Sequence, residues 1–156
     1  MANTYSQIFL QLIFAVRNRE ALITSEFEAE LFKYISGIIK NQGQKLFAIN
    51  GTKDHIHILI SLEPTCRISD LVRIIKSDSS EWINHKRLSK FKFNWQEGYG
   101  AFSYGASQIR EVIGYINNQK EHHKRSGFRE EYLQFLKKFE IQFDEKYIFE
   151  FFQNEV

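Results

Sequence analysis

The sequence predicts an α+β fold of the ferredoxin-like or RRM-like type, in which two helices cover one face of an antiparallel sheet and a third helix follows. Three observations predict it. Short runs rich in β-branched and aromatic residues alternate with segments whose apolar residues recur at helical spacing. The predicted elements follow the order strand, helix, strand, strand, helix, strand, helix. An Asn-Gly pair between the second and third strands indicates a hairpin.

The first two elements lie near the N-terminus. Residues Tyr5 to Val16 read as a strand because they are rich in Ile, Leu, Val and Phe. Ser25 is a candidate N-cap for the first helix, since acidic residues follow it in the first turn, and Gly43 would end that helix. The predicted core positions of this helix are Leu31, Phe32, Ile35, Ile38 and Ile39.

A hairpin should follow. Lys45 to Ile49 reads as its first strand, Asn50-Gly51 as the turn, and His55 to Leu62 as its second strand.

The remaining elements are two helices with a strand between them. Residues Ser69 to about His85 form the second predicted helix, and Ala101 to Tyr104 the fourth strand. Ser107 is a candidate N-cap for a third helix that runs from Gln108 to about Lys124.

Composition predicts one domain over residues 1–156, with a core at about 5–124 and a C-terminal tail at 128–156 whose role we cannot assign. The chain has one proline and no linker-like run of Ser, Gly and Pro. No apolar stretch approaches the roughly 20 residues of a membrane span. The N-terminus lacks the features of a signal peptide, and the single Cys66 cannot form an internal disulfide. These features predict a cytoplasmic protein without a membrane segment.

Charge is unevenly distributed. Residues 1–129 carry 18 Lys and Arg against 12 Asp and Glu, whereas residues 130–156 carry 3 against 7. In one basic region, aromatic residues alternate with Lys and Arg, which suits single-stranded nucleic acid because its backbone attracts cations and its bases stack on flat side chains. The aromatic residues are Trp82, Phe91, Phe93 and Trp95. An equally open alternative is a solvated basic face with ordinary core aromatics.

The run from Asp54 to Ile60 contains a His-x-His pair in a predicted strand. Alternate residues of a strand share a face, so Ile56, Ile58 and Ile60 would pack under the helices. His55 and His57 would then point to the opposite, less covered face, where two imidazoles can bind one divalent metal ion. Such a pair without further support is more often two surface histidines.

The third helix offers a polar face beside its core stripe. Tyr115 lies well off the stripe, and Gln119 stands one turn further along on the same side. The stripe consists of Ile109, Val112, Ile113 and Ile116. A tyrosine recruited for packing would usually lie on the stripe, although an ordinary surface tyrosine fits this position as well.

Three motifs together resemble the single-tyrosine transposases of small bacterial insertion sequences, members of the HUH endonuclease superfamily, and their REP-associated relatives. The motifs are Thr52-Lys53-Asp54-His55-Ile56-His57, Trp95-Gln96-Glu97-Gly98-Tyr99-Gly100-Ala101-Phe102-Ser103 and Tyr115-Ile116-Asn117-Asn118-Gln119. They occur in matching order, and the resemblance runs from about Tyr5 to Lys124.

The resemblance implies a DNA transposase that cleaves and rejoins single-stranded DNA through a 5′-phosphotyrosine intermediate. It implies that Tyr115 is the nucleophile and that His55, His57 and Gln119 bind Mg²⁺ or Mn²⁺. Imidazole ligands suit Mn²⁺ better than Mg²⁺, which prefers oxygen. It further implies hairpin-containing element ends as substrate and a homodimer, with Tyr115 acting on its own or the partner's metal site.

Two other functions remain open. A non-catalytic RRM-like module would stack bases on an open sheet face and would not need Tyr115 and Gln119. A domesticated HUH nicking endonuclease would use the same site. Asp54 could orient an imidazole or belong to the hairpin turn, and the turn is favoured. The sequence gives no reason to place Cys66, His85, His122 or His123 in the site, and it shows no obvious general base.

Overall fold

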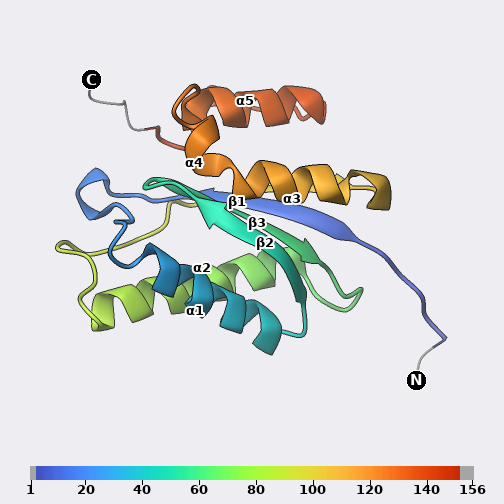
Figure 1. The fold of residues 1–156 in the computed structure, drawn as a ribbon, viewed down its shortest axis with the longest axis horizontal. Coiled ribbons are helices and arrows are strands. Elements are labelled where there is room, and N and C mark those ends of the chain that lie inside the picture. The colour runs from blue at the N-terminus through green and yellow to red at the C-terminus, as the bar shows by residue number, and fades with distance from the viewer. Residues whose placement is uncertain (1–2, 152–156) are drawn as a thin grey trace.

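A computed structural model describes residues 3–151 of the chain. Its centre is a four-stranded antiparallel sheet with the strand order β2-β3-β1-β4 (Figure 1). The strands are β1 (Phe9–Ala15), β2 (Lys45–Gly51), β3 (His55–Ser61) and β4 (Gly100–Tyr104). This order is that of a ferredoxin-like fold, so the predicted α+β class is confirmed.

Helices α1 (Glu28–Asn41) and α2 (Ile68–His85) cover one face of the sheet (Figure 1). Their buried residues, including Ile35 and Ile75, pack with Ile56, Ile58 and Ile60 in one apolar core. The bounds of α2 agree with the prediction. The predicted cap of α1 was wrong, because α1 begins three residues after Ser25 and its N-cap, Phe27, makes no side-chain capping bond.

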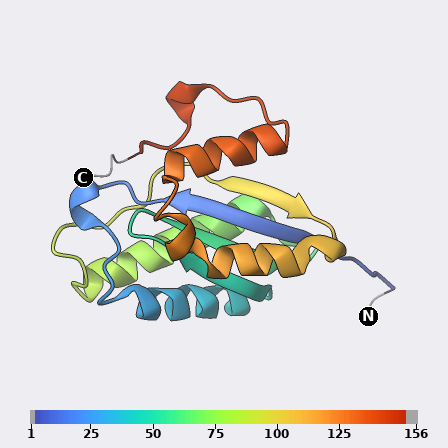
Figure 2. The same cartoon turned by 45° about the horizontal axis from the view of Figure 1, so that its top comes forward.

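Strands β1 and β3 are buried on both faces. Every residue of β3 except Ser61 is buried, including His55 and His57. The two histidines point away from the isoleucine face as predicted, but their own face is not open. Helix α3 (Ile109–Asn117) packs against β2 and β3, and helix α5 (Phe128–Lys138) lies beside it (Figures 1 and 2).

The turn of the β2–β3 hairpin lies later than predicted. Asn50 and Gly51 are the last residues of β2, and residues 52–54 connect the strands. Gly51 is required by a close approach, because a Cβ at this position would lie 2.2 Å from the His55 carbonyl oxygen. The glycine therefore lets β2 run tightly against the start of β3.

The predicted third helix is interrupted. A short 3₁₀ turn at Ala106–Gln108 precedes α3, and α3 ends at Asn117 before a single turn, α4 (Gln119–His122). Ser107 lies inside the 3₁₀ turn instead of capping the helix. Asn50 holds the break, since its Nδ2 donates to the carbonyl oxygens of Ile116 at 3.0 Å and Asn117 at 3.2 Å.

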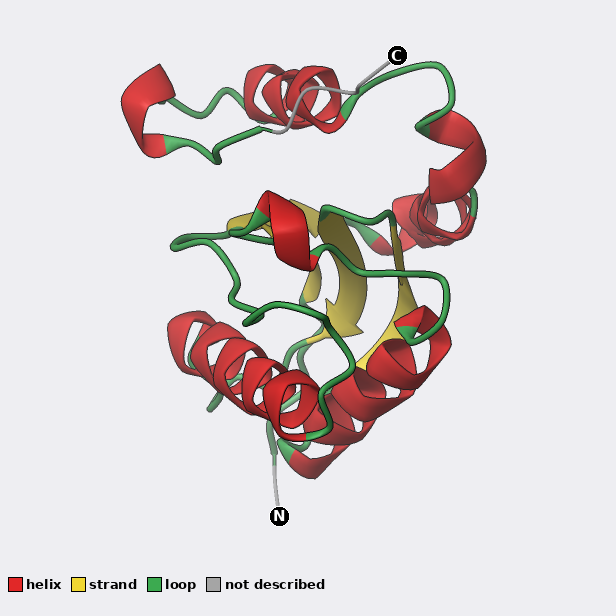
Figure 3. Cartoon of the chain, turned by 90° about the vertical axis from the view of Figure 1, so that its left-hand side faces the viewer, coloured by secondary structure: helices red, strands yellow, loops and turns green. Residues whose placement is uncertain are grey.

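The described part of the predicted tail folds onto the sheet. The aromatic rings of Phe102 in β4 and Phe135 in α5 lie with centroids 5.1 Å apart, so α5 covers the β4 side of the face that carries the histidines. Figure 3 shows the sheet between two layers of helices. Residues 152–156 of the predicted tail lie outside the described residues. Within residues 3–151 no helix is both long and apolar enough to cross a membrane.

Candidate active site

His55 and His57 form the floor of the candidate site. Both are 0% exposed, and their ring centroids are 5.1 Å apart. A neighbouring side chain contacts the Nδ1 atom of each ring, and both Nε2 atoms point toward the same carboxylate, that of Glu131.

Asp54 orients His55. Its Oδ1 lies 2.7 Å from His55 Nδ1, and it also accepts a hydrogen bond from the Thr52 hydroxyl at 2.8 Å. Burial acts to raise the pKa of Asp54, but the hydrogen bond and charge of His55 outweigh it and lower that pKa. The carboxylate is therefore ionised and accepts a hydrogen bond from His55 Nδ1–H. Asp54 thus fills both roles that the sequence left open, since it orients His55 and also bonds to Thr52 within the hairpin turn.

Gln11 and Tyr104 orient His57. Gln11 Nε2 lies 2.8 Å from His57 Nδ1, and the Tyr104 hydroxyl donates to Gln11 Oε1 at 2.7 Å. Burial lowers the pKa of His57 to about 4 against the opposing charge of Glu131. His57 is therefore a neutral imidazole, the form that binds metal ions.

Helices α3 and α4 bring the two polar residues predicted on the third helix to the histidines. The Tyr115 ring is half-buried, with its centroid 6.0 Å from that of His57. Gln119 is 0% exposed and follows the break at Asn118. All four predicted site residues thus converge within one chain.

A carboxylate that sequence reasoning missed occupies the centre of the site. Glu131 Oε1 lies 2.9 Å from His57 Nε2, 3.2 Å from His55 Nε2 and 3.0 Å from His123 Nε2. Its other oxygen, Oε2, accepts hydrogen bonds from Gln119 Nε2 at 3.0 Å and from the Tyr115 hydroxyl. Burial acts to raise the pKa of Glu131, but its interactions with these histidines hold it well below the usual range.

His123 also belongs to the site, contrary to the sequence reading that left it out. It follows Gln119 by four residues, so the helical spacing of Gln119 and His123 was the available signal. No comparable signal pointed to Glu131, because it lies in a segment to which no chemistry was assigned.

Aromatic residues of α5 close the site. The Phe128 ring stacks on His55, with centroids 3.8 Å apart and planes at 7°. The Phe135 ring lies 5.9 Å from Tyr115 and 6.1 Å from His57, measured between centroids. These contacts, together with α3, exclude solvent from both histidines.

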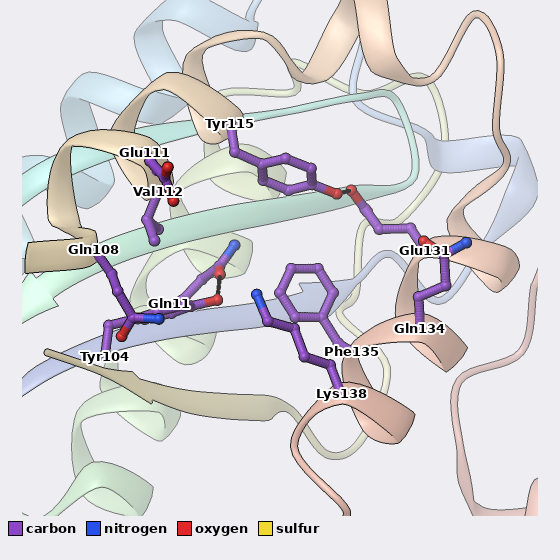
Figure 4. Close-up of a pocket in the computed structure, with 10 residues that line it drawn as sticks. All are labelled: Gln11, Tyr104, Gln108, Glu111, Val112, Tyr115, Glu131, Gln134, Phe135 and Lys138. Carbon is purple, nitrogen blue, oxygen red and sulfur yellow. Dashed lines mark hydrogen bonds between the residues drawn. The ribbon is translucent and has the colours of Figure 1, made fainter.

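A cavity of about 320 Å³ opens beside Tyr115 (Figure 4). In the close-up, the side chains of Tyr115 and Glu131 point toward one another across one end of the cavity. Gln11, Tyr104, Phe135 and Lys138 are among the other lining residues. Burial and the charge of Glu131 raise the pKa of Tyr115, so its phenol is protonated at rest.

The donor set fits a divalent metal ion. One ligand atom from each of His55, His57, His123 and Glu131 lies within 4.8 Å of the other three. Two polar atoms at the site, His55 Nε2 of this set and Gln119 Oε1 beside it, are buried and make no hydrogen bond of acceptable geometry. Buried polar atoms without a partner are costly, and a cation would satisfy both.

The aromatic residues of the basic region are mostly part of the core. Phe93 and Trp95 are 0% and 7% exposed, and Trp82 stacks on Tyr34 with centroids 4.5 Å apart. Phe91 is 46% exposed. For three of the four aromatics, packing in the protein therefore replaces the predicted stacking on bases.

Comparisons with known proteins show the family of this chain. The family model described as "Transposase IS200 like" matches residues 4–119. The crystal structure of a candidate transposase from Deinococcus radiodurans matches with a TM-score of 0.62 and 21% identity, over 76% of this chain and 95% of that one. A REP-associated tyrosine transposase bound to a REP hairpin matches with a TM-score of 0.59 and 17% identity, over 79% of this chain and 73% of that one. No curated protein gave a significant match. Because the family model covers most of the chain, including all four predicted site residues, the chain belongs to the IS200-like DNA transposases.

Proposed function

We propose that this transposase cleaves and rejoins single-stranded DNA through a covalent bond between Tyr115 and a 5′ phosphate. The observation that carries the proposal is the convergence of Tyr115 with His55, His57 and Gln119, with the Tyr115 ring 6.0 Å from that of His57. A nucleophile beside a preorganised cation site is the arrangement that phosphoryl transfer requires.

His55, His57 and Gln119 would hold Mg²⁺ or Mn²⁺. A bound divalent cation would polarise a non-bridging oxygen of the scissile phosphate. Asp54 and Gln11 keep the two imidazoles in place, which preserves the geometry when DNA binds.

In the cleavage step, Tyr115 Oη forms a bond to phosphorus as the bond from phosphorus to the 3′ oxygen breaks. The phenol loses its proton, and the departing oxygen gains one and becomes a free 3′-OH. The reverse step, attack of a 3′-OH on the phosphotyrosine, rejoins DNA without an external energy source.

A basic cavity at the edge of the site supports a path for the DNA backbone. Lys53, Lys120 and Lys124 line this cavity; Glu28 lines it as well and pairs with Lys120, and Lys124 pairs with Glu121. Asp54 and His123 also line the cavity, and they contact His55 and Glu131, respectively. Cations in such a groove neutralise successive phosphates of a single strand.

Hairpin-containing element ends are the proposed DNA substrate. The cytoplasm is the proposed cellular compartment.

An RRM-like binding module is disfavoured because α3 and α5 cover the sheet face on which such a module would stack bases. The domesticated nicking endonuclease shares the proposed site and differs in the fate of the cut strand. It would release the covalent end without joining it to a second DNA end.

Trapping the covalent adduct tests the proposal. Labelled single strands of the DNA that flanks the coding sequence are incubated with full-length protein and Mn²⁺, then separated on a denaturing protein gel. Wild type and the control Tyr147→Phe, which alters an 86%-exposed tyrosine, should form the adduct. Tyr115→Phe should form none while binding the strand with unchanged affinity, and EDTA should abolish the adduct. An adduct with Tyr115→Phe would refute the assignment of the nucleophile.

The fate of the adduct separates transposase from nicking enzyme. Addition of a second strand with a free 3′-OH should yield a joined DNA product from the wild-type adduct. Stable adduct with no joined product would favour the nicking endonuclease.

A further inference from the structure

We propose that Glu131 and His123 complete the metal site with His55 and His57, so that the ion anchors helix α5 on the sheet. This inference rests on the proposed metal site and extends it to residues beyond the region matched by the transposase family model, which ends at residue 119.

The positions of the donor atoms carry the inference. The four ligand atoms lie within 4.8 Å of one another, and three of the four residues are buried. Neighbouring ligand atoms bound to one ion at about 2.1 Å in octahedral geometry are roughly 3.0 Å apart. The distances of 2.9, 3.0 and 3.2 Å from Glu131 Oε1 to the three imidazole nitrogens are close to that spacing.

The surroundings of the four residues favour ligation as well. Asp54 and Gln11 contact the Nδ1 atoms of His55 and His57, which are the atoms on the far side of each ring from Glu131. A carboxylate that accepts the Nδ1–H, as Asp54 does for His55, commonly orients a metal-bound histidine. The Glu131 side chain is only 2% exposed, and a buried carboxylate needs compensating positive charge.

The chemistry of this set selects the ion. Three imidazoles and one carboxylate suit Mn²⁺ better than Mg²⁺, which favours an oxygen shell with several waters. A carboxylate also brings a full negative charge, whereas the amide oxygen of Gln119 brings only a dipole. Glu131 should therefore contribute more to metal affinity than Gln119.

The same contacts allow an opposing interpretation, in which Glu131 occupies the place of the ion and leaves when the ion binds. The two interpretations predict opposite effects of removing the carboxylate. If Glu131 is a ligand, its loss weakens metal binding. If it competes with the ion, its loss leaves binding unchanged or makes it tighter.

Calorimetric titration of full-length protein with Mn²⁺ distinguishes them. The variants are Glu131→Gln, which keeps the side-chain shape, His123→Asn as an independent second ligand change, and Glu130→Gln as a matched control on the exposed side of the same turn. Circular dichroism in EDTA checks that each variant folds. We expect at least about a 10-fold loss of affinity for Glu131→Gln and for His123→Asn, and none for Glu130→Gln.

Amide hydrogen exchange supplies a readout other than binding. Mn²⁺ should increase the protection of residues 128–138 in wild type and in Glu130→Gln, but not in Glu131→Gln. Equal or tighter Mn²⁺ binding by Glu131→Gln would overturn the inference. His57→Ala tests the proposed function separately, because unchanged Mn²⁺ affinity in that variant would refute the proposed metal site at the two histidines.

Discussion

The Tyr115 hydroxyl donates a hydrogen bond to Glu131 Oε2, and the other oxygen of the same carboxylate lies 2.9 Å from His57 Nε2. One side chain of the tail thus joins the candidate nucleophile to the candidate metal ligands. Under the proposed mechanism, a phosphate that reaches Tyr115 Oη has to replace this hydrogen bond, so we expect the docking of α5 and the access of DNA to Tyr115 to be coupled.

The link between Tyr115 and Glu131 should be measurable as a coupling energy. In a double-mutant cycle of Tyr115→Phe and Glu131→Gln, urea unfolding in EDTA should give a coupling of about 0.5–3 kcal/mol, as for other residues in direct contact. The pair Tyr147→Phe and Glu130→Gln, two exposed side chains that share no hydrogen bond, serves as control and should show additivity within about 0.5 kcal/mol. Additivity at the Tyr115 and Glu131 pair would mean that the hydrogen bond does not form in solution.

His57→Ala should destabilise the metal-free protein, contrary to what a histidine on an open face would suggest. The substitution leaves Gln11 Nε2 without its buried partner, at a cost of about 1–3 kcal/mol, and removes one of the three imidazoles around Glu131 Oε1. Urea unfolding in EDTA measures the change. His85→Ala alters an exposed histidine and should have little effect. An unfolding free energy equal to that of wild type would show that His57 is solvated.

Asp54→Asn should reduce Mn²⁺ affinity about 10- to 100-fold, because the ionised carboxylate holds His55 through its Nδ1 proton. Calorimetric titration gives the affinity. Asp70→Asn changes a half-exposed aspartate on α2 and is the matched control. A wild-type Mn²⁺ affinity in Asp54→Asn would show that Asp54 acts only in the hairpin turn and not in metal binding.

Phe128→Ala should cost about 3–5 kcal/mol of unfolding free energy, as for other buried phenylalanines. Phe128 is 6% exposed and stacks on His55, so its loss removes packing between α5 and β3. Phe91→Ala, at a side chain that is 46% exposed, should change stability by much less. A small effect in thermal or urea unfolding would indicate that α5 does not dock on the sheet in solution.

The protein should be a homodimer in which each Tyr115 acts with the histidines of its own chain. Two DNA ends must be held together during transposition, and a closed symmetric pair supplies two sites. The contact of Tyr115 with His57 and Glu131 of the same chain favours action in cis. Light scattering should give twice the chain mass of 18.6 kDa.

A mixing experiment tests the arrangement. A mixture of His57→Ala and Tyr115→Phe proteins should stay inactive if Tyr115 acts in cis, because every site then carries one lesion. Recovery of cleavage in the mixture would show that Tyr115 acts in trans. A monomer mass in light scattering would rule out the predicted dimer.

The sequence determined the order of elements from β1 to α3 and the face on which the β3 residues lie. The alternation of β3 places Ile56, Ile58 and Ile60 under α1 and α2 and turns His55 and His57 to the other side, because the side-chain period of a strand is two. Local spacing likewise put Tyr115 off the core stripe of α3. Such features depend on neighbours a few residues apart, so they are readable from the chain itself.

Only the tertiary structure decided what covers the histidines. Glu131 lies 74 positions after His57, and no periodicity links two positions so far apart. The break at Asn118, held by Asn50 of β2, turns the chain so that Gln119 and His123 face the site and α5 returns over the sheet. These contacts depend on packing between distant segments. The predicted open face therefore proved to be a closed site with a carboxylate at its centre.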